Sequence, residues 1–105
     1  MKQLRTQSPQ RAALFEKKLL QAVLALRTER EAREFFRDLC SPAELEAMAD
    51  RWAVVEELQR GLPYRAIHQK TGVSVTTVGR VARTLALGKG GYETIAERVS
   101  ARKEA

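Results

Sequence analysis

The residues best suited to recognition chemistry lie between positions 64 and 81 of this 105-residue chain, where two short helical patterns meet. Gly72 suits the positive φ of a tight turn. Val73 is placed to fill the angle between the two helices, and Ser74 is a typical N-cap for the second one. This pattern is typical of a helix-turn-helix, whose second helix lies in the DNA major groove.

The inward and outward residues of these two helices support the same interpretation. Ile67 and Val78 are spaced to pack the helices against each other. Val75 and Thr76 fall in the first turn of the second helix, where they offer methyl groups to thymine and a hydroxyl to base edges. Gly79 leaves room for DNA to approach, and nearby arginines can reach phosphates. The predicted DNA-contacting residues are Arg65, His68, Ser74, Val75, Thr76, Thr77, Gly79, Arg80 and Arg83.

The charge distribution agrees with a polyanionic partner. The chain has 19 Lys and Arg against 13 Asp and Glu, a net charge of +6. Residues 1–30 carry +5, residues 31–60 carry −4, and residues 61–105 carry +5. A basic excess confined to particular segments is typical of nucleic-acid binding. A solvated basic surface explains the same charges, so charge alone leaves both interpretations open.

Composition excludes several other classes of function. One cysteine and one histidine cannot form an internal disulfide or a zinc site, which needs at least three protein ligands. The only histidine lies in the DNA-reading motif, so no nucleophile has a base partner and we expect no enzymatic activity. No apolar run approaches the ~20 residues that span a bilayer, and the N-terminus lacks a signal peptide. We therefore expect a cytoplasmic protein, nucleoid-associated when bound to DNA, without membrane or metal partners.

The hydrophobic periodicity predicts an all-α protein of about six helices. Caps or breakers mark their ends, and the expected starts are Ser8-Pro9, Thr28 with Glu31, Ser41-Pro42 with Glu44, Pro63, Ser74 and Glu93. We expect a single domain over 1–105. Its parts are dimerisation and core helices over 1–60, the helix-turn-helix over 62–86, a glycine-rich loop over 88–91 and a C-terminal helix over 92–105.

The first predicted helix carries a wide apolar arc that includes Leu14, Phe15, Leu20 and Leu24. Isolated helices shorter than ~12–15 residues are marginal in water, so the short C-terminal helices need a partner to pack against. A chain of this length has little interior to offer them. The arc therefore indicates a homodimer in which two chains share a core.

The central segment resembles the Trp repressor family. The resemblance rests on Ser41 to Arg51, on the run Val55-Glu56-Glu57-Leu58-Gln59-Arg60-Gly61, and on the helix-turn-helix, and covers about residues 39–87. Gly90-Gly91-Tyr92 is similar to the YerC/YecD branch of that superfamily. The resemblance implies an intertwined, all-helical homodimer that represses transcription by binding a palindromic operator on double-stranded DNA.

The resemblance also implies a small-molecule effector pocket beside the helix-turn-helix. Arg51 and Arg80 stand where the family has the two arginines that flank tryptophan. The pocket residues implied are Ser41, Arg51, Thr77, Arg80, Val81 and Thr84. Val81 replaces a family glycine against which the indole rests. A β-branched side chain there would project into the indole site, which argues against L-tryptophan as the effector. The two alternatives are another ligand or a pocket filled by the protein's own side chains.

Several residues keep two interpretations. His68 suits a pH-sensitive phosphate contact or an ordinary surface position. Trp52 and Tyr64 could stack on bases, although Trp52 falls on an apolar stripe that favours core packing. Cys40 suits a redox sensor or a small apolar residue. The alternative function is a non-catalytic interaction module that docks on a protein through the helix-turn-helix, favoured by Val75 and Val81 if both lie on its outer face.

Overall fold

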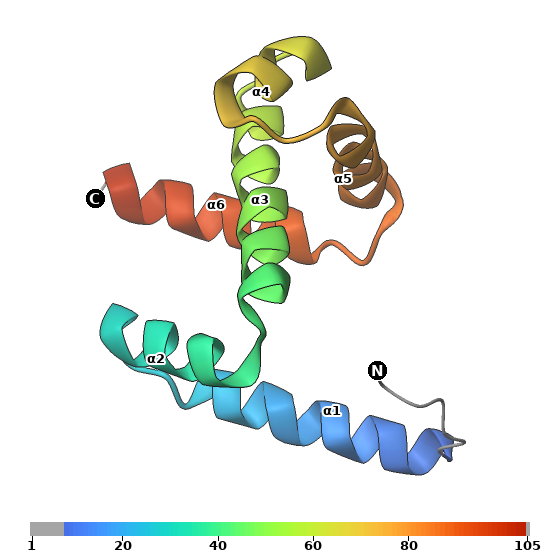
Figure 1. Ribbon diagram of the computed structural model, residues 1–105. Coiled ribbons are helices and arrows are strands. Elements are labelled where there is room, and N and C mark those ends of the chain that lie inside the picture. Colours follow the sequence, from blue (N-terminus) through green and yellow to red (C-terminus); the bar gives the residue numbers. More distant parts are fainter. Residues whose placement is uncertain (1–7, 105) are drawn as a thin grey trace. The chain divides into compact units, whose positions relative to one another are not determined.

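The computed structural model describes residues 8–104, and over this range it contains six α-helices and no strand. The helices are α1 (Pro9–Leu24), α2 (Glu29–Leu39), α3 (Pro42–Gln59), α4 (Tyr64–Thr71), α5 (Val75–Leu87) and α6 (Gly91–Glu104) (Figure 1). The predicted all-α class with about six helices is confirmed.

The chain divides into two compact units, with the boundary between Ser41 and Pro42. The first unit holds α1 and α2, and the second holds α3 to α6. The boundary falls inside the segment 1–60 that the sequence assigns to dimerisation and core helices.

The two helices of the first unit begin where the sequence predicts. Ser8 Oγ accepts a hydrogen bond from the Arg11 N–H at 3.1 Å, and Thr28 Oγ1 accepts one from the Glu31 N–H at 3.1 Å. The Glu31 carboxylate accepts from the Arg27 N–H at 2.9 Å, one residue before the N–H that a standard capping box uses. Local side-chain chemistry therefore fixes both helix starts.

The first unit has no buried residue in either of its helices. Leu14, Phe15, Leu20 and Leu24 of α1 are all exposed, and Leu24 keeps 84% of its surface accessible. A contiguous apolar face of this kind is unusual on a monomeric surface. The wide apolar arc predicted for the first helix is thus present and uncovered in the single chain.

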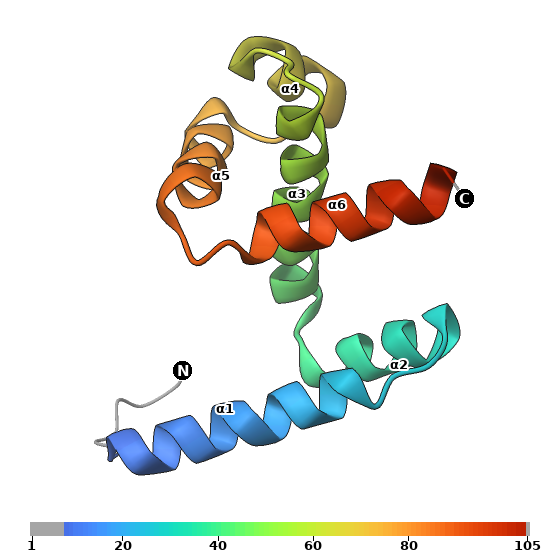
Figure 2. The same cartoon turned by 180° about the vertical axis from the view of Figure 1, so that it is seen from behind.

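The second unit is built around α3, which contacts α4, α5 and α6. In both views α6 crosses α3 (Figures 1 and 2). Helix α4 lies at the C-terminal end of α3, and α5 lies beside α3. Burial of β-branched side chains between these helices holds the unit together. The buried apolar residues are Val54, Val55, Ile67, Val73, Val78 and Val81.

The C-terminal element boundaries differ slightly from the sequence-based expectation. Pro63 is the N-cap of α4, and α5 continues one residue further than expected, to Leu87. Helix α6 begins at Gly91, so the glycine-rich loop covers 88–90 rather than 88–91. The reason is that Gly90 adopts a φ of 87° and its carbonyl accepts from the Thr94 N–H at 3.1 Å, which starts the helix at the next residue.

Candidate nucleic-acid interface

The turn between α4 and α5 has the predicted helix-turn-helix geometry. Gly72 is left-handed, with a φ of 78°, and its N–H donates to the His68 carbonyl at 2.8 Å. Val73 is buried at the turn, and Ile67 and Val78 are completely buried beside it. The predicted turn glycine, inter-helix plug and packing pair are confirmed.

Two side chains of α4 fasten this turn. Thr71 Oγ1 donates to the Ile67 carbonyl at 2.7 Å and accepts from the Val73 N–H at 3.1 Å. His68 Nδ1 lies 2.7 Å from the Val73 carbonyl oxygen. Because a carbonyl only accepts, Nδ1 donates the proton, which leaves Nε2 for an outside ligand. The sequence offered His68 as a DNA contact or a surface residue and did not reveal this structural role.

The N-terminus of α5 is capped by Ser74. Its Oγ accepts from the Thr77 N–H at 3.1 Å and donates to Thr77 Oγ1 at 3.1 Å. The predicted cap is confirmed. Both hydroxyls, each predicted to contact DNA, therefore serve first to fix the initial turn of α5.

The outward face of α5 forms one side of an open groove of about 720 Å³. Its lining residues are Tyr64, Val75, Thr76, Gly79, Arg80, Ala82, Arg83 and Ala86. Five of them are predicted DNA contacts, so the structure brings together the base-reading and phosphate-contacting residues of α5 on one surface. Tyr64, offered above as a base-stacking residue, also lines the groove. Sequence reasoning missed Ala82 and Ala86, although both follow the same helical face as Gly79 and Arg83.

Of the three arginines predicted to contact phosphates, Arg80 and Arg83 line this groove and Arg65 is not among its lining residues. Arg65 lies on α4, while Arg80 and Arg83 lie on α5. Within residues 8–104, none of the three takes part in an ion pair. Their guanidinium groups are therefore available for phosphates, to which arginine binds in bidentate geometry.

A carboxylate beneath the helix-turn-helix ties α4 to α3. The Glu57 side chain is only 9% exposed and pairs with Lys70 of α4 at 3.0 Å and with Arg60 at 2.8 Å. The hydrogen bond from Lys70 is the main cause that lowers the pKa of Glu57 below its ordinary value. Partial burial opposes this effect, and Arg60 adds to it. The pairing of two residues 13 positions apart fixes α4 on the central helix.

Val81 does not lie on the outer face of α5. It is 2% exposed and belongs to the buried cluster with Val54 and Val78. Val75 and Val81 therefore do not both face outward, because the Val81 side chain packs against α3. Val75, at 48% exposed, is the outward valine of the pair, which weakens the case for an apolar protein-docking face.

The residues implied for an effector pocket are distributed over both units. Ser41 ends the first unit, and the other five lie in the second. Arg80 lines the α5 groove, whereas Thr84 lines a separate cavity of about 290 Å³ with Leu85, Lys89 and Tyr92 among its other residues. The Val81 side chain lies in the buried cluster and lines neither of these two cavities. Its position in the single chain therefore does not support the argument that it projects into the indole site, and the expectation against L-tryptophan stays a prediction.

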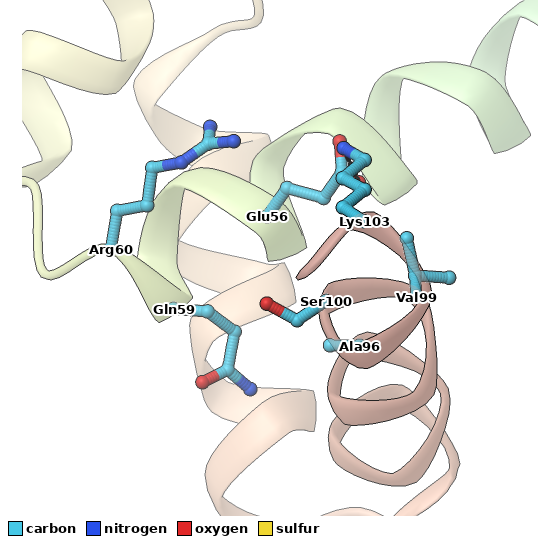
Figure 3. Close-up of a pocket in the computed structure, with 7 residues that line it drawn as sticks. All are labelled: Glu56, Gln59, Arg60, Ala96, Val99, Ser100 and Lys103. Carbon is cyan, nitrogen blue, oxygen red and sulfur yellow. Dashed lines mark ion pairs between the residues drawn. The ribbon is translucent and has the colours of Figure 1, made fainter. Parts of the chain in front are cut away.

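The opposite side of the second unit holds a small cavity of about 140 Å³ between α3 and α6 (Figure 3). Glu56 from α3 and Lys103 from α6 approach to 3.8 Å there. Near the other end of α6, the rings of Tyr92 and Trp52 lie 6.4 Å apart, and both pack against the buried cluster. This placement confirms the core-packing interpretation of Trp52.

Residues 8–104 contain no helix that is long and apolar enough to cross a membrane. The same residues contain no group of three or more His, Cys, Asp or Glu side chains arranged to hold a metal ion.

The six-helix fold and the groove on α5 define a protein of the helix-turn-helix class. The chain belongs to the Trp repressor family, because the family model described as "Trp repressor protein" matches residues 16–100. Membership in this family indicates a DNA-binding regulator and a fold that is generally non-enzymatic.

Similar proteins agree with this assignment. The chain is 37% identical over 81 residues to the uncharacterised protein YerC of Bacillus subtilis strain 168, a match that covers 77% of this chain and 78% of that protein. A TrpR-like protein from Eubacterium eligens ATCC 27750 is 37% identical, with a TM-score of 0.76 over 80% of this chain and 87% of that one. A candidate Trp repressor from Staphylococcus aureus is 35% identical, with a TM-score of 0.78 over 85% and 87%. The predicted resemblance to a YerC-type member of the family is confirmed.

Proposed function

We propose that this protein is a sequence-specific transcriptional regulator that represses genes by occupying a palindromic operator as a homodimer in the cytoplasm. The observation that carries the proposal is the exposed face of α5. Thr76, Arg80 and Arg83 share one groove there, on a helix that buries Val78 and Val81 against the rest of the unit. This arrangement supports a rigid helix that inserts into the major groove.

The exposed face of α1 supports the homodimer. Phe15, Leu20 and Leu24 keep 51%, 54% and 84% of their surface exposed, and neither helix of the first unit has a buried residue. A second copy of the chain offers the same apolar face, which is the self-complementary contact of a two-fold dimer. Burial of these side chains would give α1 and α2 the core that they lack.

The free energy of specific recognition supports two copies of α5 as well. Specific binding exceeds non-specific binding by ~4–10 kcal/mol, whereas one good base contact provides ~1–3 kcal/mol. The small side chains of one α5, chiefly Val75 and Thr76, barely reach the lower bound. Two copies on adjacent half-sites reach it, and a two-fold dimer makes those half-sites palindromic.

Selection of bound sequences from a random DNA pool tests the proposal. We expect an enriched inverted repeat, and transcription from a promoter that contains it should fall when the protein is added. Binding should weaken steeply with salt, because bound phosphates release counterions. If the protein enriches no sequence and retards no DNA at low salt, the proposal is wrong, and capture of a protein partner would favour the interaction module.

Two variants separate base reading from phosphate binding. Thr76→Ala should change the enriched sequence at one position of each half-site. Arg65→Gln should weaken binding to operator and random DNA alike, and lower the salt slope by about 0.9 for each phosphate that is no longer neutralised. If Thr76→Ala weakens binding to all DNA alike and Arg65→Gln changes the enriched sequence, the proposed orientation of α5 in the major groove is wrong.

We propose, on the family resemblance, that a small-molecule effector other than L-tryptophan modulates this regulator through Arg51, Arg80 and Thr84. Arg51 lies on α3, and Arg80 and Thr84 lie on α5, the second helix of the helix-turn-helix. Anisotropy titrations of operator DNA with and without candidate amino acids test this proposal. A tryptophan-dependent gain in affinity would overturn the choice of effector.

A further inference from the structure

Tyr64 is an aromatic residue of the α5 groove for which the sequence offers base stacking without fixing its position. It is the first residue of α4, and its side chain lines the α5 groove beside Thr76 and Arg80. The residue is 45% exposed. It therefore lies between the two helices of the motif with much of its surface open to a ligand.

The core does not explain this position. The other two aromatic residues of the second unit, Trp52 and Tyr92, pack against the buried cluster and against each other. Tyr64 is not among the side chains that pack on that cluster. An exposed ring with a polar tip outside the core is the usual arrangement of a residue that contacts a partner.

The ring of Tyr64 lies next to Gly79 of α5. A Cβ atom at position 79 would lie 3.9 Å from Tyr64 Cε2, with no closer neighbour outside the local helix backbone. The ring therefore rests against the glycine face of α5. Tyr64, Thr76 and Arg80 line the same groove.

We propose that Tyr64 is a DNA-contacting and positioning residue, whose hydroxyl donates a hydrogen bond to a backbone phosphate at the edge of the major groove. The inference rests on the proposed DNA-binding function and deepens it. In a helix-turn-helix the first helix crosses the DNA backbone, which brings the start of α4 to the phosphates. Phosphate contacts fix the position of the recognition helix on DNA. Because the Tyr64 ring packs against Gly79, its phosphate contact helps to position α5.

Loss of the neutral Tyr64 hydroxyl and loss of the Arg65 charge should affect the salt dependence of DNA binding differently. A tyrosine hydroxyl donates without neutralising a charge, so its removal should leave the salt slope unchanged. Removal of the Arg65 charge should reduce that slope. A role confined to folding would change neither affinity nor slope once the fold is intact.

Anisotropy titrations of the full-length protein on its selected operator and on random DNA test the inference. Tyr64→Phe removes only the hydroxyl, and should weaken both complexes about tenfold for each bound helix-turn-helix, with an unchanged salt slope. Tyr64→Ala also removes the ring, and should lower the ratio of operator to random affinity. Gln69→Ala, an exposed change on the same helix, serves as the matched control and should bind as the original protein does.

Thermal melts by circular dichroism confirm that each variant folds, and Tyr64→Phe keeps the ring in place. If this variant binds both DNAs within twofold of the original protein, the inference is wrong while the proposed function stands. If it weakens binding and also lowers the salt slope, the phenol is not a neutral phosphate donor and the inference is again wrong. If the unaltered protein binds no DNA, the proposed function fails and the inference fails with it.

Discussion

Replacement of Gly79 by alanine should make this protein more stable and a weaker DNA binder. Gly79 lies in the interior of α5, where glycine costs ~0.5–1 kcal/mol relative to alanine. The added methyl meets Tyr64 Cε2 at 3.9 Å, an ordinary van der Waals contact, so no clash offsets the gain. We expect the free energy of unfolding to rise by ~0.5–1 kcal/mol and Tm by roughly 2–8 °C for a domain of this size.

The same methyl stands in the groove that faces DNA. It removes the close approach that the sequence predicts at this position, and we expect operator affinity to fall while random-DNA affinity falls less. Thermal and urea denaturation followed by circular dichroism measure the first effect, and anisotropy titrations measure the second.

Gly72→Ala is the matched control for this experiment. Its φ of 78° places an L-residue in the left-handed region, which costs ~1–2 kcal/mol, so this variant should be less stable although its Cβ has open space. If Gly79→Ala also destabilises the protein, the described environment of Gly79 is wrong. If it stabilises the protein and binds the operator as tightly as before, the α5 groove is not the DNA-facing surface.

Three further predictions concern the buried carboxylate, the dimer and the effector. Because its pKa is lowered in the fold, Glu57 stabilises the protein fully above its ordinary pKa and loses this contribution as the pH falls through the lowered value. The stability difference between the original protein and Glu57→Gln in urea titrations should therefore shrink with acidification, and an acid-independent difference would contradict the Lys70 pairing. Phe15→Arg should convert the dimer to a monomer in light scattering and weaken operator binding, whereas a dimer of unchanged affinity would place the subunit contact elsewhere. L-tryptophan should leave operator affinity unchanged, and a gain of more than a few-fold in anisotropy titrations would overturn this expectation.

Local features of the fold were predictable from the sequence. Ser8, Thr28 and Ser74 cap helices through bonds to residues three positions ahead, and Gly72 takes a conformation that few other residues tolerate. Such interactions depend on neighbours in sequence, so residue type and spacing suffice to find them. The helix-turn-helix itself was recognisable for the same reason.

Features that depend on packing between helices were not predictable. Val75 and Val81 both fall at apolar positions of the α5 pattern, and packing on α3 decides that Val81 is buried whereas Val75 stays half exposed. The Glu57–Lys70 pair and the contact of Tyr64 with Gly79 join residues at least 13 positions apart. The hydrogen bond of His68 to Val73 required the observed turn geometry, because a histidine at the start of a turn has no fixed partner in sequence.

The composition of the buried core has a consequence for how DNA affinity can be switched. All six buried apolar side chains are valine or isoleucine, and five of them lie in helices, where such side chains are held almost entirely to one χ1 rotamer. A core of this kind has few alternative packings. We therefore expect the helix-turn-helix to move as a rigid body, without rearrangement of its core. In the proposed dimer, an effector that alters DNA affinity would have to rotate one helix-turn-helix relative to the other and change the spacing of the two α5 helices, while the core of each subunit stays as it is.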